Sequence, residues 1–270
     1  MPILAVTREM GSLGTFIGQE VARRLGYTFI RHQIVAEAAQ VYDAAEEKLI
    51  ATVESKPGPW DALNDAARRH FAFLAAEVFD SALKDNVVIM GRWSTLLLRG
   101  VDHALRVRVC APTELRIQRI AERRGVGSEE AQALIRRSDE GVRARIRQFF
   151  DVDWGDPAVY DVVLTTQRLS VVRGADLLCH FLGQPEWQAT DASRAILQDA
   201  VLAARVRAAL KADPETTRLN VKVICRGGRL ELAGTVESQE GRDGATRVAA
   251  AQPGVLAVAN HLTIMRFPKW

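Results

Sequence analysis

The sequence predicts an α/β protein in two parts, an open parallel sheet flanked by helices and then a small α+β unit. From residue 3 to about residue 182, short apolar runs alternate with amphipathic stretches, a rhythm typical of a sheet with helices on both faces. After "GQPEWQATDAS" the order becomes helix, strand, strand, helix, strand. We therefore expect a first domain at residues 1–182, a linker at 183–192 and a second domain at 193–267.

The first domain is expected to contain four main strands joined by helices. Short apolar or alternating runs predict strands at residues 3–7, 86–91, 105–111 and 159–166, and "YTFI" is a shorter run of the same kind. Apolar residues at helical spacing predict helices at residues 15–25, 33–52, 61–83, 112–124, 125–150 and 170–182.

The second domain is expected to be an αββαβ unit. Helices are predicted at residues 194–212 and 238–251, and strands at 218–225, 229–237 and 255–264. Leu219, Val221, Val223 and Cys225 alternate along the first of these strands, which places them on one face of a sheet.

Composition excludes several classes of protein. The chain is 48% hydrophobic and 26% charged, a mixture typical of soluble globular proteins. Its apolar stretches are too short for a membrane span, and its start does not resemble a secretion signal. Three separated cysteines without metal-ligand spacing favour a cytoplasmic location. No basic stripe interleaved with aromatic residues indicates a nucleic-acid partner.

Positive charge is concentrated in one region of the chain. Residues 106–147 contain eleven arginines against six acidic residues. Such an excess suits ligands rich in phosphate. The alternative is a solvated helix surface laced with ion pairs.

Residues 8–15, "REMGSLGT", join the first strand to the first helix. In a phosphate-binding turn, successive backbone N–H groups and a helix N-terminus converge on phosphate oxygens, and glycines let the main chain approach closely. Gly11 and Gly14, with Ser12 between them, allow this geometry, but no lysine follows the second glycine as in an ordinary P-loop. The alternative is a tight turn whose glycines serve backbone geometry only.

Five arginines lie where they suit phosphate binding. Arg92 follows the predicted strand 86–91, at the sheet edge where open α/β sheets bind ligands. Arg116 and Arg119 share one face of a predicted helix, and Arg143 and Arg147 share a face of the next. The planar, permanently charged guanidinium matches phosphate oxygens. The alternative for each is an ordinary surface ion pair.

Four motifs occur in order: "TREMGSLG", "VVIMGRW", "APTELRIQRI" and "DVDWGDPAVYDVVLTT". Together they resemble the cytidylate kinase-like family of P-loop proteins over about residues 1–182. The resemblance implies a nucleoside monophosphate kinase that uses ATP and Mg²⁺, with a CMP- or dCMP-like pyrimidine nucleotide as the phosphate acceptor.

The resemblance also implies roles for single residues. The implied nucleotide-binding residues are Arg8, Gly11, Ser12, Gly14 and Thr15, with the Thr15 hydroxyl as a metal ligand. The implied catalytic residues are Arg92, which would face the monophosphate, and Arg116, Arg119 and Arg143, which would close over the phosphates.

Three positions depart from the family pattern. Gly14 aligns with the P-loop lysine, Phe16 lies in a pair that commonly includes an arginine in relatives, and Arg31 stands where relatives tend to carry an aspartate for the acceptor. An arginine cannot accept a hydrogen bond. These departures keep a second hypothesis open, a nucleotide-binding sensor or adaptor without turnover.

The end of the chain resembles a BON domain over about residues 195–265, through "GRLELAGTVES" and "PGVLAVANHLTI". The resemblance implies contact with a phospholipid or a protein partner. The alternative is that this domain packs only on the first domain or on a second copy in a homo-oligomer.

Overall fold

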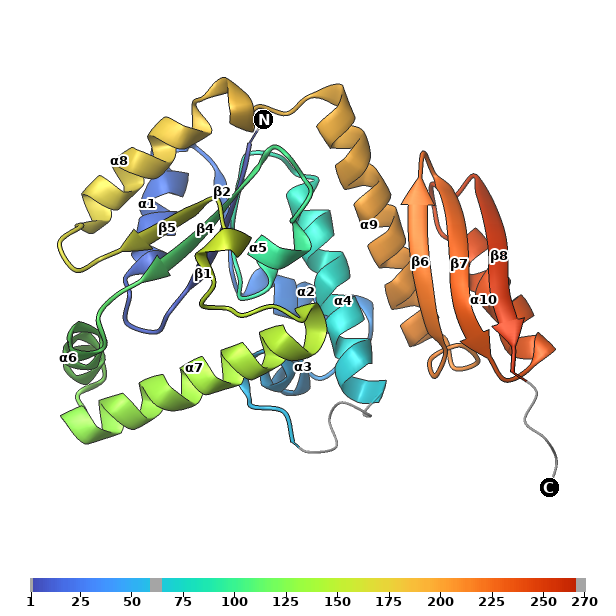
Figure 1. Cartoon of the computed structure of the whole chain (residues 1–270), viewed down its shortest axis with the longest axis horizontal. Helices are drawn as coiled ribbons and strands as arrows, with labels where there is room; N and C mark the ends of the chain where they lie inside the picture. Colours follow the sequence, from blue (N-terminus) through green and yellow to red (C-terminus); the bar gives the residue numbers. More distant parts are fainter. Residues whose placement is uncertain (1, 59–64, 266–270) are drawn as a thin grey trace.

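The computed structural model describes residues 2–58 and 65–265. Its larger part is a five-stranded parallel sheet in the order β2-β3-β1-β4-β5, with helices on both faces (Figure 1). The strands are β1 (Ile3–Arg8), β2 (Thr28–Ile30), β3 (Val87–Met90), β4 (Ala104–Cys110) and β5 (Val162–Thr165). This arrangement confirms the predicted open α/β fold.

The central strand β1 positions the loop that follows it. Its apolar residues are all buried, as expected for a strand covered on both faces. Ile3 pairs with Val87 of β3 and with Ala104 of β4. The carboxyl ends of these three strands therefore meet at one edge of the sheet, where ligands of such folds bind.

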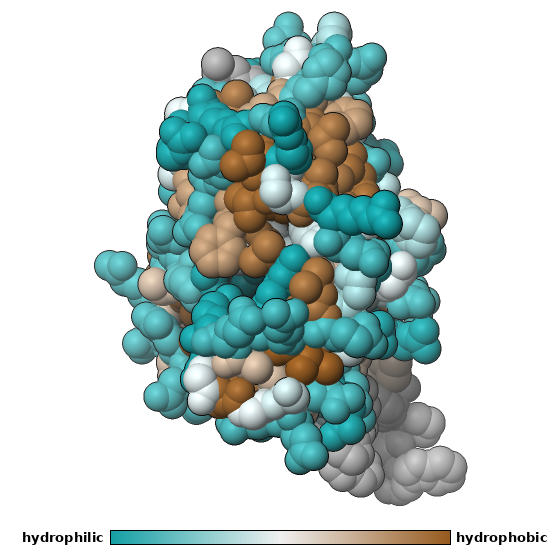
Figure 2. All heavy atoms as spheres, turned by 90° about the vertical axis from the view of Figure 1, so that its left-hand side faces the viewer, coloured by the Kyte–Doolittle hydropathy of each residue, from teal (hydrophilic) through white to brown (hydrophobic). Residues whose placement is uncertain are grey.

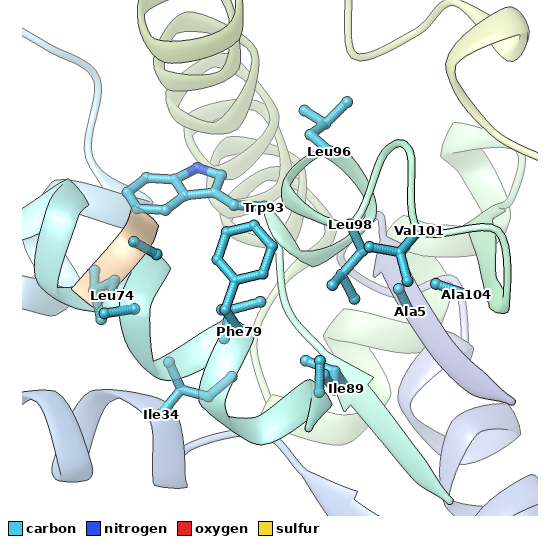
Figure 3. Close-up of a cluster of buried hydrophobic side chains, with 14 of the residues drawn as sticks. Ala5, Ile34, Leu74, Phe79, Ile89, Trp93, Leu96, Leu98, Val101 and Ala104 are labelled. Carbon is cyan, nitrogen blue, oxygen red and sulfur yellow. The ribbon is translucent and has the colours of Figure 1, made fainter. Parts of the chain in front are cut away.

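Helices cover the two faces of the sheet in separate layers. Helices α1 (Gly14–Leu25) and α8 (Val171–Leu182) pack on one face. Helices α2 (Gln33–Val41) and α4 (Asp65–Ala82) pack on the other. Figure 3 shows part of this second core, where Phe79 of α4 lies among Trp93, Ile34 and Ile89.

Two differences from the predicted elements have local causes. The region 33–52 is not one helix, because Asp43 has a φ of 48° and the chain restarts as α3 (Glu46–Glu54). The short helix α5 (Ser94–Leu97) was not predicted, because its four residues are too few to show a period. The predicted start of the helix at 61–83 lies outside the described residues.

Two helices form a layer below the sheet edge. They are α6 (Thr113–Arg124) and α7 (Ser128–Phe150). Figure 1 shows α7 running beneath the sheet between α6 and α3. Helices α3, α6 and α7 are therefore close to the ends of β1, β3 and β4.

The end of the chain forms the predicted αββαβ unit. It consists of α9 (Asp191–Ala212), β6 (Asn220–Arg226), β7 (Arg229–Val236), α10 (Gln239–Ala250) and β8 (Ala257–Ile264). Strands β6 and β7 are antiparallel, and β7 and β8 are parallel. Val223 lies in its core, as the alternation predicts, together with Leu230 and Leu232 of β7.

Helix α9 contributes to two hydrophobic cores. Leu197, Val201, Ala204 and Ala208 pack into the core against α4, whereas Ala203, Val206 and Leu210 pack into the core of the αββαβ unit. The Arg205 guanidinium also pairs with Asp80 of α4 at 2.8 Å. A division of the chain near residue 191 remains our proposal, with α9 shared by both units.

The face that carries α8 leaves apolar side chains in contact with solvent, and Figure 2 shows such side chains gathered among hydrophilic ones. Val172, Leu177 and Phe181 of α8 are among the exposed large hydrophobic residues. Among the described helices, none combines the length and the apolar character needed to cross a membrane.

Candidate functional site

The loop between β1 and α1 has the backbone shape of a phosphate-binding turn. Gly11 has a φ of 82° and Leu13 a φ of 63°, both in the left-handed region. A Cβ at Gly11 would lie 3.0 Å from the Arg116 carbonyl oxygen, so this residue must be glycine for the loop to pack on α6.

Two carbonyl groups of this loop, those of Met10 and Ser12, are held by side-chain donors. Arg116 Nε donates to the Met10 carbonyl at 2.7 Å, and Thr166 Oγ1 donates to the Ser12 carbonyl at 2.9 Å. Because a trans peptide points its C=O and the next N–H in opposite directions, the N–H groups of Gly11 and Leu13 face the other way. Within the described residues no acceptor binds those amides or those of Gly14 and Thr15.

Gly14 cannot be replaced by a lysine in this backbone. A Cβ at Gly14 would lie 2.8 Å from Arg8 Cβ and 2.9 Å from Val109 Cβ, inside the packing between α1 and the sheet. Any positive charge for a bound phosphate must therefore come from another part of the chain.

A cleft of about 750 Å³ opens beside the loop. Its walls are the loop and the first turns of α1, Arg31 after β2, helix α3, Arg92 after β3, and the facing sides of α6 and α7. Among the described residues, its arginines are Arg8, Arg31, Arg92, Arg119, Arg123, Arg124 and Arg137. Its acidic residues are Glu9, Glu47 and Glu54.

Arg8, Arg31 and Arg92 form a concentrated positive charge in this cleft. Burial and the neighbouring charges of Arg31 and Arg92 lower the pKa of Arg8 to about 10. Burial also lowers the pKa of Arg92, although Glu54 opposes this effect. Arg92 contacts Glu54 at 3.2 Å, and its second terminal nitrogen is buried with no partner in the described chain. Glu54 is thus the nearby acid for three guanidinium groups, and a bound phosphate would supply further negative charge.

Two predicted site residues, Arg8 and Arg119, form hydrogen bonds with the loop and the start of α1. Arg8 Nε donates to Thr15 Oγ1 at 2.6 Å, which fixes the guanidinium beside the first turn of α1. Arg119 donates to the Gly11 carbonyl at 3.2 Å and to Thr166 Oγ1 at 2.9 Å, and it also lines the cleft. Arg8, Gly11, Gly14, Thr15, Arg92 and Arg119 are thus brought together around one cavity.

Arg116 belongs to a buried ion-pair network. It is 4% exposed, and its terminal nitrogens contact Asp139 at 2.9 Å and Glu9 at 3.3 Å. Glu9 in turn accepts a hydrogen bond from Arg108 at 2.8 Å. Because its guanidinium is occupied, Arg116 braces the loop against α6 and α7 and does not line the cleft.

Ser12 and Arg143 also lie outside the lining of this cleft. Ser12 is fully buried, and its hydroxyl has no partner in the described chain. Arg143 and Arg147 line a second, shallower cleft of about 570 Å³ with Lys56 and Asp153. Asp153 and Asp156 each accept a hydrogen bond from a backbone amide two residues on, as turn-forming aspartates do.

Several residues of the site were not identified from the sequence. Arg123 follows Arg119 by one helical turn, so an extension of the 116–119 spacing along α6 would have found it. Arg137 reaches the cleft from α7, and Glu9 joins the buried network, through long-range packing that residue spacing does not report.

The cleft does not contain a metal site of its own in the described chain. No group of three or more histidine, cysteine, aspartate or glutamate side chains is arranged to hold a metal ion there. The Thr15 hydroxyl accepts from Arg8, and a guanidinium at that distance disfavours a cation on the same oxygen. While it accepts this hydrogen bond, the Thr15 hydroxyl does not fit the metal ligand that the sequence predicts.

Comparison with known proteins identifies both parts of the chain. Residues 3–168 match the model of the cytidylate kinase-like family. This chain belongs to the cytidylate kinase-like family. Residues 198–266 match the model of the BON domain, so the second resemblance is also confirmed.

Two curated cytidylate kinases illustrate the relationship. The one from Staphylothermus marinus is 28% identical over 106 residues, covering 38% of this chain and 58% of that protein. The one from Thermoplasma acidophilum is 25% identical over 167 residues, covering 61% of this chain and 83% of that protein. The chain spans about half the length of the first curated relatives that it matches.

A solved structure shows the same fold. An uncharacterized protein from Eubacterium ventriosum aligns with a TM-score of 0.53 at 17% identity, covering 67% of this chain and 98% of that one.

Proposed function

We propose that this member of the cytidylate kinase-like family is a nucleoside monophosphate kinase with a lysine-free loop. It transfers the γ-phosphoryl group of ATP to a CMP- or dCMP-like acceptor. The supporting observation is the cluster of Arg8, Arg31 and Arg92, which lines the same cleft as the loop and has Glu54 as its nearby acid.

The proposed division of labour follows from the contacts. The loop amides and Arg119 bind the donor phosphates, and Arg8 takes the place of the missing lysine because Thr15 holds it beside the loop. Arg92 and Arg31 bind the acceptor phosphate. Arg116 positions the loop, and Arg143 lies outside the reacting groups.

The transfer itself requires little covalent chemistry from the protein. An oxygen of the acceptor phosphate forms a bond to the γ-phosphorus, and the bond from that phosphorus to the β,γ-bridging oxygen breaks, which leaves ADP. Fixed arginines stabilise charge on the moving group and on the leaving oxygen. Mg²⁺, as part of the proposal, arrives bound to the phosphates of ATP.

Diphosphate formation tests this function directly. ATP binding is measured by calorimetry, and each of the four common nucleoside monophosphates is then incubated with ATP while diphosphate formation is followed. We expect ATP binding and slow turnover with a pyrimidine monophosphate. A protein that does not bind ATP would contradict the proposal.

A specific observation favours a second candidate, a nucleotide-binding sensor. Gly14 occupies the position of the lysine and is closely packed, so the usual donor is structurally excluded. Loss of one well-placed donor typically lowers an enzymatic rate about 100- to 1,000-fold. Tight ATP binding without phosphorylation of any acceptor would select the sensor.

Replacing Arg8 with glutamine is expected to stabilise the ligand-free protein and to weaken ATP binding. Because the pKa of Arg8 is lowered to about 10 in the folded protein, its charge favours unfolding at every pH below that value. We expect the free energy of unfolding to rise by roughly 1–2 kcal/mol and the melting temperature by about 2–8 °C. ATP affinity should fall by about tenfold or more.

Arg24→Gln is the matched control for this experiment. Hydrogen bonds from Arg24 to Glu20 and Asp176 raise its pKa, so its removal should lower the melting temperature and leave ATP binding unchanged. Equal ATP affinity in Arg8→Gln and the unaltered protein would remove Arg8 from the proposed site.

The remaining assignments are proposals of the same kind. The three cysteines are free, consistent with a cytoplasmic location. We propose that the BON domain contacts a phospholipid or a protein partner, with a second copy in a homo-oligomer as the alternative. We expect no nucleic-acid partner.

A further inference from the structure

We infer that Phe16 is a specificity-determining residue, whose ring packs against the base of the acceptor and so restricts this site to nucleotides. The inference rests on the proposed function, because it concerns the acceptor subsite of the same cleft.

Phe16 is an exposed aromatic side chain in a cleft otherwise crowded with arginines. It is 45% exposed, and among the described residues it is the aromatic member of the lining. Leaving a large aromatic ring exposed to water is unfavourable, and a planar ligand that stacks on the ring would bury this apolar surface.

A second exposed apolar residue lies on another wall of the cleft. Ile50 of α3 is 40% exposed and lines the same cavity as Phe16. Single exposed apolar residues are common on protein surfaces, but two on different walls of one cleft indicate a ligand with an apolar or planar part.

The orientation of α1 places Phe16 toward the acceptor side. Gly174 of α8 packs against Ile17, and Gly18 packs against Phe29 and Met90 of the sheet. At 100° per residue, Phe16 and Gln19 lie on the remaining side of the helix, away from α8. In the strand order β2-β3-β1-β4-β5, Arg31 follows the edge strand β2, whereas α6 follows β4 on the other side of β1. Both Arg31 and α6 line the cleft, so Phe16 lies toward the side of Arg31.

The acceptor subsite therefore has one charged part and one apolar part. Arg31 and Arg92 suit a phosphate dianion, while Phe16 and Ile50 suit a planar ring. The Gln19 side-chain amide can both donate and accept hydrogen bonds, so it suits the polar edge of such a ring. A nucleoside monophosphate has both parts. A sugar phosphate without a base has only the first.

Calorimetry with three probes tests the inference: CMP, ribose 5-phosphate and ATP. In Phe16→Ala we expect CMP affinity to fall by about 5- to 100-fold, the range of base stacking on an aromatic side chain. Ribose 5-phosphate and ATP affinities should change by less than about twofold, within the error of such measurements. Phe16→Tyr keeps the ring and should retain CMP binding.

Leu25→Ala is the matched control, because Leu25 is an exposed apolar residue of α1 outside the cleft lining. Equal CMP affinity in Phe16→Ala and the unaltered protein would overturn the inference but leave the proposed kinase intact. Loss of ATP binding in place of CMP binding would also overturn it and assign Phe16 to the donor. If the unaltered protein binds no nucleoside monophosphate at all, the proposed function itself fails.

Discussion

Replacing Arg92 with alanine is expected to lower kcat/KM for diphosphate formation by about 100- to 1,000-fold. Arg92 is largely buried, and its free terminal nitrogen faces no partner within the described chain. In the proposed reaction Arg92 is a fixed hydrogen-bond donor to the acceptor phosphate. Its loss removes stabilisation of negative charge in the transition state, and mobile water molecules do not provide the same fixed donor. The rate is measured with ATP and the best monophosphate acceptor.

Arg143→Ala is the appropriate comparison, because Arg143 is also an arginine of this region but lines the second cleft. Its replacement should change kcat/KM by less than about threefold, as is usual for surface changes remote from a site. Circular dichroism establishes that both variants are folded. Equal losses in the two variants would show that Arg92 has no special role.

Replacing Val201 with aspartate is expected to destabilise the whole protein by roughly 3–4 kcal/mol, since it places an unpaired charge in a hydrophobic core. Val201 is 3% exposed and belongs to the part of α9 that packs with α4. The melting temperature should fall by roughly 6–15 °C. Thermal unfolding of the full chain gives the measurement.

Ile196→Asp provides the control on the same helix, because Ile196 is 46% exposed. It should change the free energy of unfolding by no more than about 0.5 kcal/mol. If Val201→Asp is equally mild, α9 does not stabilise the first core, and the proposed sharing of this helix is wrong.

The strands and most helices could be predicted because their signals are local. The nearly continuous apolar run "ILAVT" indicates a strand buried on both faces. The spacing of Leu230 and Leu232 indicates a strand buried on one face. The break at Asp43 was missed because a single left-handed residue leaves no periodic signal. The two-sided burial of α9 was also missed, since one helix facing two cores has no single apolar stripe.

The site could be predicted best at the strand ends. Arg8 ends β1 and Arg92 lies two residues after the end of β3, so sheet topology alone places them together. Arg116 and Arg143 share the residue type and the helical spacing of true cleft residues. Their different surroundings depend on the packing of α6 and α7 around Glu9 and Asp139, which spacing along one helix does not contain.

The tight packing at Gly14 has a consequence for the history of this lineage. A lysine at that position would collide with both Arg8 Cβ and Val109 Cβ, so no single mutation restores the ordinary loop. A lysine loop on this backbone would need changes in β1 and β4 as well as at Gly14. Natural selection on this backbone can therefore raise phosphate affinity more readily by recruiting cations from other elements than by placing a lysine at Gly14.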